Sequence, residues 1–302
     1  MRRMRFGRSL IATVVAGMGF AGLAKADVVT FDNTSDLGNN FSINVQSGTT
    51  ATPGYPGFIA VSSGGIGNSG AVDVTAGPSG TLDATGVYTP KSFNPQNGTI
   101  TVSQYVKVQA TTTGDRLLHL GIIDDPGATH QLNGGGAARA DFISARLFPT
   151  VATVAGAATS PFTYQVQSGN SVDSPSTATA TTNNTQTANF DLTIGDWYLF
   201  TMNVNRLATA NTFSVDSKLQ DFGTDGLTPG ATMTFAAQTI AANTTDIYND
   251  TSVYGAFRSH ATNGGADLLD TFSVSQTVPE PATLGVIGLG AAGLLGRRRN
   301  KR

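Results

Sequence analysis

The stretch WYLFTMNVNRLATANTFSVDSKLQ, which runs from Trp197 to Gln220, decides the class of fold. Large apolar side chains fall on every second residue of its two halves, which is the pattern of a strand with one buried face. The segment RLATAN, residues 206–211, separates the halves and predicts a hairpin turn between strands at 197–206 and 211–220. The alternating side chains are Tyr198, Phe200, Met202 and Val204 in the first half and Phe213, Val215 and Leu219 in the second.

Short segments with the same alternation recur throughout residues 27–277, called the body here, and none of it shows a sustained helical period. The clearest are 99–109 and 268–275. Glycine and proline separate the segments. Many short strands between turns predict one all-β domain, a single β-sandwich or jelly roll. The other predicted strands cover 41–45, 57–61, 116–123, 141–148, 162–167, 233–237 and 253–258.

One part of the body differs in composition. Residues 173–189, DSPSTATATTNNTQTAN, are mostly Ser, Thr, Asn and Ala and form a low-complexity segment. Because such a segment cannot bury much apolar surface, we predict an exposed loop there. No internal repeat and no linker divides residues 27–277, so we expect them to form one domain.

The first 26 residues have the layout of a secretory signal peptide. Four arginines occur among the first eight residues, residues 10–23 are apolar, and Ala24-Lys25-Ala26 is a small-x-small cleavage site. We therefore predict export by the general secretion machinery and cleavage by signal peptidase, with the mature chain starting at Asp27. An uncleaved membrane anchor is the alternative, although the apolar run is short for one.

The last 25 residues, VPEPATLGVIGLGAAGLLGRRRNKR, combine an apolar run with a basic end. Residues 282–296 carry no charge, and as a helix they would span roughly 22 Å, at about 1.5 Å per residue. A bilayer core is about 30 Å thick, but Arg297, Arg298 and Arg299 can extend to the lipid head groups. We therefore predict one transmembrane crossing with the basic residues 297–302 in the cytoplasm. A buried core helix is the alternative.

The order of these parts resembles a known signal. Pro279-Glu280-Pro281, the apolar run and the basic end are together similar to the PEP-CTERM sorting signal of Gram-negative bacteria, over residues 278–302. The resemblance implies that an exosortase, a membrane-embedded protease or transpeptidase, recognises Pro279, Glu280 and Pro281. It also implies transient insertion in the inner membrane, followed by delivery to the cell surface or matrix, often in producers of extracellular polysaccharide. The two prolines keep the backbone extended, which suits a processing substrate.

The charges of the chain are unevenly distributed. Five of the 18 Lys and Arg lie within residues 2–25 and five within 297–302, whereas all 19 Asp lie in the body. The body therefore carries eight cations against 19 Asp, a net charge of −11. Nucleic-acid binding requires a basic surface and is excluded. Because the chain has no cysteine, its core or bound ions must stabilise the exported domain.

The body also resembles a known fold. The stretches 197–223, VYGAFRSH (253–260) and LLDTFSVS (268–275) look like the later strands of concanavalin A-like lectin and glucanase sandwiches, the laminin-G-like group. The resemblance implies that the last strand pairs with the first, 269–275 with 28–31. It also implies that the domain binds or cleaves carbohydrate.

Catalytic patterns are weak in this chain. Retaining glucanases of that group use a Glu-x-Asp-x-(x)-Glu strand, but the only Glu is Glu280, outside the body. No Gly-x-Ser-x-Gly motif indicates a serine hydrolase. His119 falls in a predicted strand and is interpreted as a packed or surface residue, while His130 and His260 fall in loops. We expect no enzyme, and the alternative is a divergent carbohydrate-active enzyme that uses two Asp as an acid–base pair.

Two loop segments carry candidate calcium ligands. Asp124 and Asp125, in GIIDDPGATHQLNGGG, follow a predicted strand, and Asp221 and Asp225 lie in the turn QDFGTDG. Carboxylates and backbone carbonyls in loops are the ligands that Ca²⁺ prefers, so Ca²⁺ is the candidate cofactor. Neither stretch matches an EF-hand loop. The alternative is that these Asp side chains cap the turns through nearby backbone groups.

Glycan sites combine aromatic side chains with a few polar groups. The candidate aromatics are Tyr55, Tyr88, Tyr248 and Tyr254, whereas Trp197, at the start of a strand, is expected in the core. We therefore predict an exported cell-surface or extracellular-matrix protein, sorted by an exosortase, whose lectin-like sandwich binds polysaccharide. A purely structural matrix protein without a ligand is a further alternative.

Overall fold

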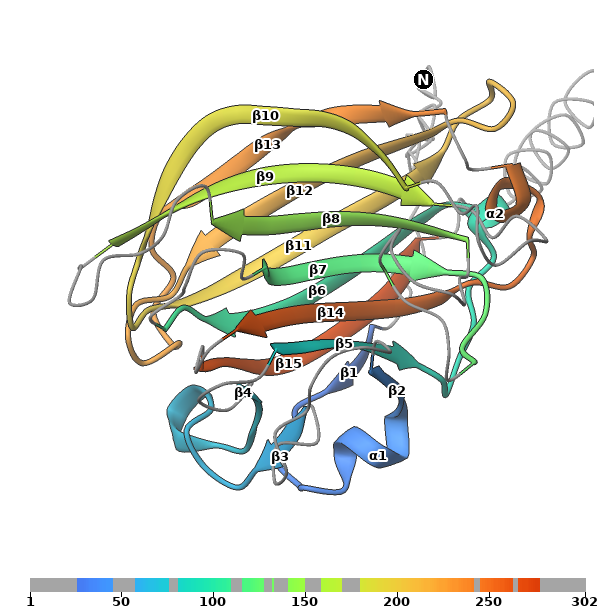
Figure 1. Cartoon of the computed structure of the whole chain (residues 1–302). Coiled ribbons are helices and arrows are strands. Elements are labelled where there is room, and N and C mark those ends of the chain that lie inside the picture. Colours follow the sequence, from blue (N-terminus) through green and yellow to red (C-terminus); the bar gives the residue numbers. More distant parts are fainter. Residues whose placement is uncertain are drawn as a thin grey trace, which may run out of the picture. The chain divides into compact units, whose positions relative to one another are not determined.

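The fold is built from two antiparallel β-sheets that lie face to face, called sheet A and sheet B here (Figure 1). Every pairing among the described strands is antiparallel. The computed structural model describes residues 26–45, 58–75, 81–109, 116–127, 132, 141–149, 159–169, 180–241, 245–262 and 266–277.

Sheet A has eight strands in the order β13-β12-β11-β6-β15-β4-β3, with β1 also paired to β15. The last described strand, β15, therefore lies inside the sheet and is flanked by strands from the first half of the chain. The strands are β1 (Asp27–Val29), β3 (Ile59–Val61), β4 (Ala71–Thr75), β6 (Thr99–Lys107), β11 (Trp197–Arg206), β12 (Phe213–Asp221), β13 (Thr232–Ile240) and β15 (Ala266–Thr277).

Sheet B has seven strands in the order β10-β9-β8-β7-β14-β5-β2. In Figure 1 its strands β10, β9, β8, β7 and β14 lie in front of sheet A. The strands are β2 (Phe41–Val45), β5 (Thr81–Tyr88), β7 (Arg116–Ile123), β8 (Phe142–Pro149), β9 (Thr159–Gly169), β10 (Ala180–Thr193) and β14 (Tyr254–Thr262).

Helical segments are short in the described part of the chain. They are α1 (Asp36–Asn40), α2 (Thr245–Asn249) and the single 3₁₀ turns η1 (Ile66–Asn68) and η2 (Pro95–Asn97). No helix among the described residues has both the length and the apolar character needed to cross a membrane. The predicted crossing at 282–296 lies outside the described residues, as do residues 1–25 of the predicted signal peptide.

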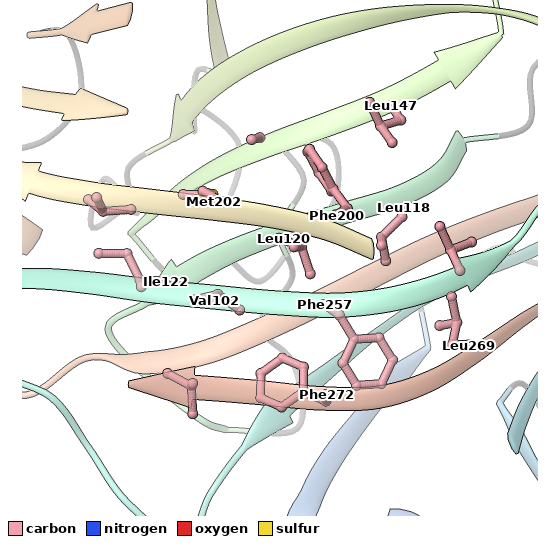
Figure 2. Packing of buried hydrophobic residues seen from close by; sticks show 14 of the residues in the cluster. Val102, Leu118, Leu120, Ile122, Leu147, Phe200, Met202, Phe257, Leu269 and Phe272 are labelled. Atoms are coloured by element: carbon pink, nitrogen blue, oxygen red, sulfur yellow. The ribbon is translucent and has the colours of Figure 1, made fainter. Parts of the chain in front are cut away.

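The space between the two sheets is filled by apolar side chains (Figure 2). Burial alternates along β6, where Ile100, Val102 and Val106 are fully buried and the residues between the buried positions are half-exposed. Figure 2 shows side chains of β6, β11 and β15 packed against those of β7, β8 and β14. Each such side chain contributes roughly 1.5–3 kcal/mol on burial, so the core supplies the main stabilising term.

Aromatic rings from both sheets contact one another around Phe41 of β2. The ring of Phe41, on β2 of sheet B, lies 5.2 Å from the ring of Phe272, on β15 of sheet A, in an edge-on contact. It lies equally close to the ring of Phe257 on β14, at 5.2 Å. Phe31 stacks on Phe41 at 5.6 Å. Edge-on pairs add about 0.5–1.5 kcal/mol beyond area burial, so these rings help to fix the sheets in register.

The predicted all-β sandwich is confirmed, and several local predictions are confirmed with it. The strand predicted at 197–206 coincides with β11. The predicted hairpin is closed by the N–H of Leu207, which donates to the carbonyl of Thr212 at 2.9 Å. The last strand pairs with the first as predicted, because Val28 lies opposite Ser273 in the register of β1 and β15.

The prediction of an exposed loop at 173–189 is wrong for its second half. Residues 180–189 belong to β10, which pairs with β9 at one edge of sheet B. Threonine is β-branched and favours extended backbone even in a polar sequence, and an edge strand needs a partner on one side only. Composition alone therefore does not exclude a strand. Residues 173–179 lie outside the described residues.

One side chain in the core lacks hydrogen bonds. Gln104 of β6 lies between Phe200 of β11 and Phe272 of β15 in the strand register and is fully buried. Neither the nitrogen nor the oxygen of its amide has a hydrogen-bond partner. A buried polar group without a partner destabilises the folded state by roughly 1–3 kcal/mol.

We predict that Gln104→Leu raises the free energy of unfolding by about 1–2 kcal/mol, because it removes an unsatisfied amide at similar volume. Urea denaturation followed by circular dichroism measures the change. Gln276→Leu is the matched control, because Gln276 donates through Nε2 to the carbonyl of Asn94, and the same exchange should lower stability there. A loss of stability in Gln104→Leu would contradict the prediction.

Candidate functional site

A row of polar side chains crosses the face of sheet B that points away from the core, called the outer face here. Neighbouring core residues such as Leu118 and Leu120 point inward, so the residue between them, His119, points outward. The strand register places six polar residues opposite one another in one line across β2, β5, β14, β7, β8 and β9. This polar row consists of Asn44, Thr85, Arg258, His119, Arg146 and Gln165.

Much of the polar row is buried, although it lies outside the main core. Thr85, His119 and Arg258 are 0% exposed, whereas Arg146 is half-exposed. Burying a charged side chain is unfavourable unless polar partners compensate for the lost water. A guanidinium nitrogen of Arg258, Nη1, lies 3.1 Å from Nε2 of His119. The buried half of the row is therefore held together by polar contacts between neighbouring strands.

The half-exposed end of the row is an ordered pair of side chains. The Nε–H of Arg146 donates to Oε1 of Gln165 at 2.8 Å, and Nη2 of Arg146 donates to the same oxygen. Gln165 is itself 9% exposed. Because two donors of one planar group share one acceptor, Gln165 fixes the plane of the Arg146 guanidinium.

Leu132 packs over the middle of the outer face. Its N–H donates to Oγ1 of Thr85 at 3.4 Å, and its carbonyl accepts a hydrogen bond from Nε2 of Gln167 at 3.3 Å. A Cβ on Gly121 would lie 2.8 Å from Cδ2 of Leu132, so only glycine leaves room for this side chain. Beside the polar row, Leu132 forms a second, smaller apolar cluster with Val87, Ile123, Phe142 and Ala256.

Ser144 of β8 lies next to the polar row. It is opposite Gly121 of β7 and Gln167 of β9 in the strand register and is fully buried. Its hydroxyl oxygen has no hydrogen-bond partner. An unsatisfied hydroxyl beside a row of polar groups marks a position where a water or a ligand hydroxyl would be stabilised.

The polar row offers hydrogen-bond donors to oxygen atoms. Guanidinium and amide groups donate hydrogen bonds to hydroxyl, carbonyl or carboxylate oxygens. The described side chains of the row include no carboxylate, which most glycosidase mechanisms require in pairs. The arrangement therefore suits recognition of an oxygen-rich ligand.

Only one member of the polar row, His119, was predicted from the sequence as a residue of interest. The interpretation of His119 as a packed strand residue is confirmed, because it lies on β7 and is fully buried. Arg146, Arg258 and Gln165 were missed. The alternation at 116–123 shows that His119 faces away from the core, but the neighbours of β7 come from distant parts of the chain.

Asp124 and Asp125 follow β7, and the structure gives them different surroundings. Oδ1 of Asp125 accepts from the N–H of Gly127 at 2.7 Å, which is the turn-capping alternative. Oδ1 of Asp124 is buried and has no hydrogen-bond partner. Burial first, and then the nearby charges of Asp141, Asp250 and Asp125, raise the pKa of Asp124 to about 7.

Asp221 and Asp225 cap a turn after β12. Oδ1 of Asp221 accepts from the N–H of Gly223 at 2.7 Å, and Oδ1 of Asp225 accepts from the N–H of Leu227 at 2.9 Å. Both contacts are the turn-capping alternative to a calcium site. Among the residues that the structure describes, no three or more acidic, His or Cys side chains are grouped to hold a metal ion. Calcium binding therefore stays a prediction.

Trp197 is buried, as expected, but beneath this turn rather than between the sheets. It is 1% exposed, and a Cβ on Gly226 would lie 3.1 Å from its Cδ1. The Nζ of Lys107 lies 5.6 Å from the centre of its ring, a cation–π contact on the outer face of sheet A. The turn at 222–227 thus closes a small apolar site of its own.

The other described aromatic candidates do not lie on one face, because Tyr88 and Tyr248 belong to the main core and Tyr254 packs against the cluster around Leu132. Tyr88 and Tyr248 are each 6% exposed, and the guanidinium carbon of Arg206 lies 3.7 Å from the ring centre of Tyr248. Tyr254 is half-exposed on β14, on the same outer face as Arg258 four residues along. Tyr55 lies outside the described residues.

The residues predicted for processing lie almost entirely outside the described residues. Ala24 lies outside the described residues, and Ala26 is the first residue that the structure describes. His130 also lies outside them, whereas the prediction that His260 falls in a loop is wrong, because His260 lies on β14 opposite Asp83 of β5. The remaining processing residues outside the described part are Pro279, Glu280, Pro281, Arg297, Arg298 and Arg299.

Residues 277–299 match the family model described as the PEP-CTERM protein-sorting motif. This confirms the resemblance of the tail. The motif implies an exported protein that is processed by an exosortase, with a membrane-associated sorting signal of Gram-negative bacteria. The match covers the tail only, and no curated protein matches the chain.

Several solved structures are similar to the chain. The globular domain of T. cruzi calreticulin is 7% identical, with 89% of this chain and 94% of that chain covered and a TM-score of 0.48. Peanut lectin with a 9mer peptide is 14% identical, with 85% and 100% covered and a TM-score of 0.44. The endo-1,3-beta-glucanase of Streptomyces sioyaensis is 13% identical, with 84% and 96% covered and a TM-score of 0.46. These likenesses say nothing about what this chain binds.

We predict that the protein becomes more stable as the pH falls from 8 to 5, in part because of Asp124. Its folded pKa of about 7 lies above the unfolded value, so protonation favours the folded state. This stabilisation is complete below about pH 4 and is lost as the pH rises through 7. A shift of this size, reduced for partial exposure, corresponds to about 2 kcal/mol.

Urea denaturation at pH 5 and pH 8 measures the effect in the wild type and in Asp124→Asn. The variant keeps the shape of the side chain but cannot ionise, so its stability should differ less between the two pH values, by about 2 kcal/mol. An identical difference in the two proteins would show that Asp124 does not contribute.

Proposed function

We propose that the body binds polysaccharide without cleaving it, at the cell surface or in the extracellular matrix, through the outer face of sheet B. The observation that carries the proposal is the end of the polar row, where Arg146 is half-exposed and is held by the buried Gln165. The guanidinium of Arg146 can donate hydrogen bonds to oxygens of a sugar chain that lies over this end of the row. Tyr254 supplies an aromatic ring on the same face.

A second property of this face supports ligand binding. The hydroxyl of Ser144 is buried beside the row without a hydrogen-bond partner. The row itself consists of polar side chains, although apolar side chains could also pack at these positions. Replacing buried polar groups by apolar ones is often neutral or stabilising. The polar row therefore supplies hydrogen-bonding groups on this face.

We predict that the full chain, purified in a non-ionic detergent, binds at least one class of polysaccharide on a glycan array. Gln165→Leu should lower that binding at least tenfold, because it removes the acceptor that orients Arg146. Gln220→Leu is the matched control, because Gln220 lies on the outer face of sheet A and should bind as the wild type does.

Three outcomes would contradict the proposal. Absence of binding to every polysaccharide would favour a purely structural matrix protein. Release of reducing sugar, lost on exchange of an Asp for Asn, would show the alternative carbohydrate-active enzyme. Equal loss in both Gln variants would place the binding site elsewhere.

Calcium remains a prediction for the segment that contains Asp124. The buried Oδ1 of Asp124 makes no hydrogen bond and lies near the charges of Asp141 and Asp250, so a cation would relieve an unfavourable arrangement. Calcium at pH 8 should then raise the melting temperature of the wild type and leave that of Asp124→Asn unchanged. The same shift in both proteins, or none, would make the prediction wrong.

The details of sorting are also part of the proposal. Signal peptidase would cleave after Ala26, residues 282–296 would cross the inner membrane transiently, and the exosortase would recognise Pro279, Glu280 and Pro281. The wild type recovered from its cells should then have an intact mass that lacks residues 1–26 and the residues after about Val278.

Replacing Pro279, Glu280 and Pro281 by Ala should leave the tail in place and the protein in the inner-membrane fraction. Pro229→Ala, a proline exchange within the body, serves as the control and should be processed normally. A wild-type protein that keeps its C-terminus in the inner membrane would make the tail a permanent anchor.

A further inference from the structure

We infer that the polysaccharide bound at the polar row is acidic, and that Arg146 contacts its carboxylate groups. This inference rests on the proposed function and specifies its ligand. It is drawn from the distribution of charge over the body and from the geometry of the Arg146 side chain.

Cations are scarce in the body, yet two of them lie in the polar row. The body has eight Lys and Arg against 19 Asp. Arg146 and Arg258 lie on β8 and β14, separated only by His119 of β7. At about 4.8 Å between strands, their backbones are about 10 Å apart. Two of the eight cations of the body are therefore grouped on this face, and they are the groups that would attract an anionic ligand.

The described part of the row has no negative charge of its own. Its other described side chains are the amides of Asn44 and Gln165, the hydroxyl of Thr85 and the imidazole of His119. A neutral sugar gains little from cations, whereas a carboxylate forms charge-assisted hydrogen bonds that are about twice as strong as neutral ones. The composition of the row thus favours an acidic sugar over a neutral one.

Arg146 is held in the orientation that such a ligand requires. Its guanidinium bonds to Gln165 through Nε and Nη2, so the plane of the group is fixed before any ligand binds. A planar guanidinium matches the two oxygens of a carboxylate in a way that a lysine ammonium does not. Pre-ordering of this kind lowers the entropy lost on binding.

The two arginines have different access to solvent. Arg146 is half-exposed and is the group that a polymer can reach from outside, whereas Arg258 is fully buried against His119. Arg258 is therefore out of reach of a polymer, and Arg146 makes the direct contact. This assignment predicts a larger effect from the loss of the Arg146 fork than from the loss of a remote charge.

The test compares each acidic polymer with its neutral counterpart, using the full chain in a non-ionic detergent. The probes are polygalacturonate and alginate, each as the free acid and as the methyl ester, which keeps the sugar backbone and removes the charge. Binding measured by calorimetry is expected to be at least tenfold tighter for the free acid of one polymer than for its ester.

Arg146→Gln should lower affinity for the free acid at least tenfold and leave affinity for the ester unchanged. A merely structural role of Arg146 would lower both equally. Lys218→Gln is the matched control, because Lys218 is an exposed cation on the outer face of sheet A, and it should change affinity less than twofold. If Arg146→Gln does not fold, Arg146→Lys keeps the charge, loses the fork, and should also weaken binding of the acid.

The outcomes separate the inference from the function on which it rests. Equal binding of acid and ester, or binding of neutral glucans alone on the glycan array, would overturn the inference and leave polysaccharide binding intact. Absence of binding to every polymer would overturn both. Equal losses of affinity for the free acid in Arg146→Gln and Lys218→Gln would show that only the net charge of the protein matters. That result would overturn the role of Arg146.

Discussion

The pairing of β15 inside sheet A is the constraint on which the rest of the structure depends. β15 pairs with β6 on one side and with β4 and β1 on the other, so the last strand of the body completes a sheet that the first strands begin. Its Leu269, Phe272 and Val274 are fully buried in the core. Because side chains alternate along a strand, this burial sets the register, and a shift of one residue would turn the core side chains outward.

The same packing decides which side chains leave the core on sheet B. Leu118 and Leu120 of β7 are buried between the sheets, so His119 must face outward, and each neighbouring strand contributes its own outward residue to the same line. The polar row is therefore a consequence of the core, assembled from strands that lie far apart in the sequence. Its half-exposed member, Arg146, is the part of the row that a ligand can reach, which is why the proposed site of recognition lies there.

Sequence reasoning predicted the parts of the fold that depend on local alternation. The strand at 197–206 was predicted because its apolar side chains recur with period two. The pairing of the first strand with the last was instead implied by the resemblance to concanavalin A-like sandwiches. The strand at β10 was missed because its threonine-rich sequence has no apolar alternation and depends on pairing with β9. The polar row was missed for a related reason, since Arg146 and Arg258 become neighbours of His119 only through strand order.

Side-chain NMR tests the central claim, that the outer face of sheet B binds polysaccharide, most directly. In ¹⁵N-labelled protein, the signals of the Arg146 Nε–H and the Gln165 side-chain amide report on the proposed site. The corresponding signals of Arg206 and Gln220, in sheet A, serve as controls. Addition of a polysaccharide that binds on the array should shift the signals of Arg146 and Gln165 and leave the other two in place. Shifts confined to Arg206 and Gln220, or none in the presence of bound polymer, would contradict the account.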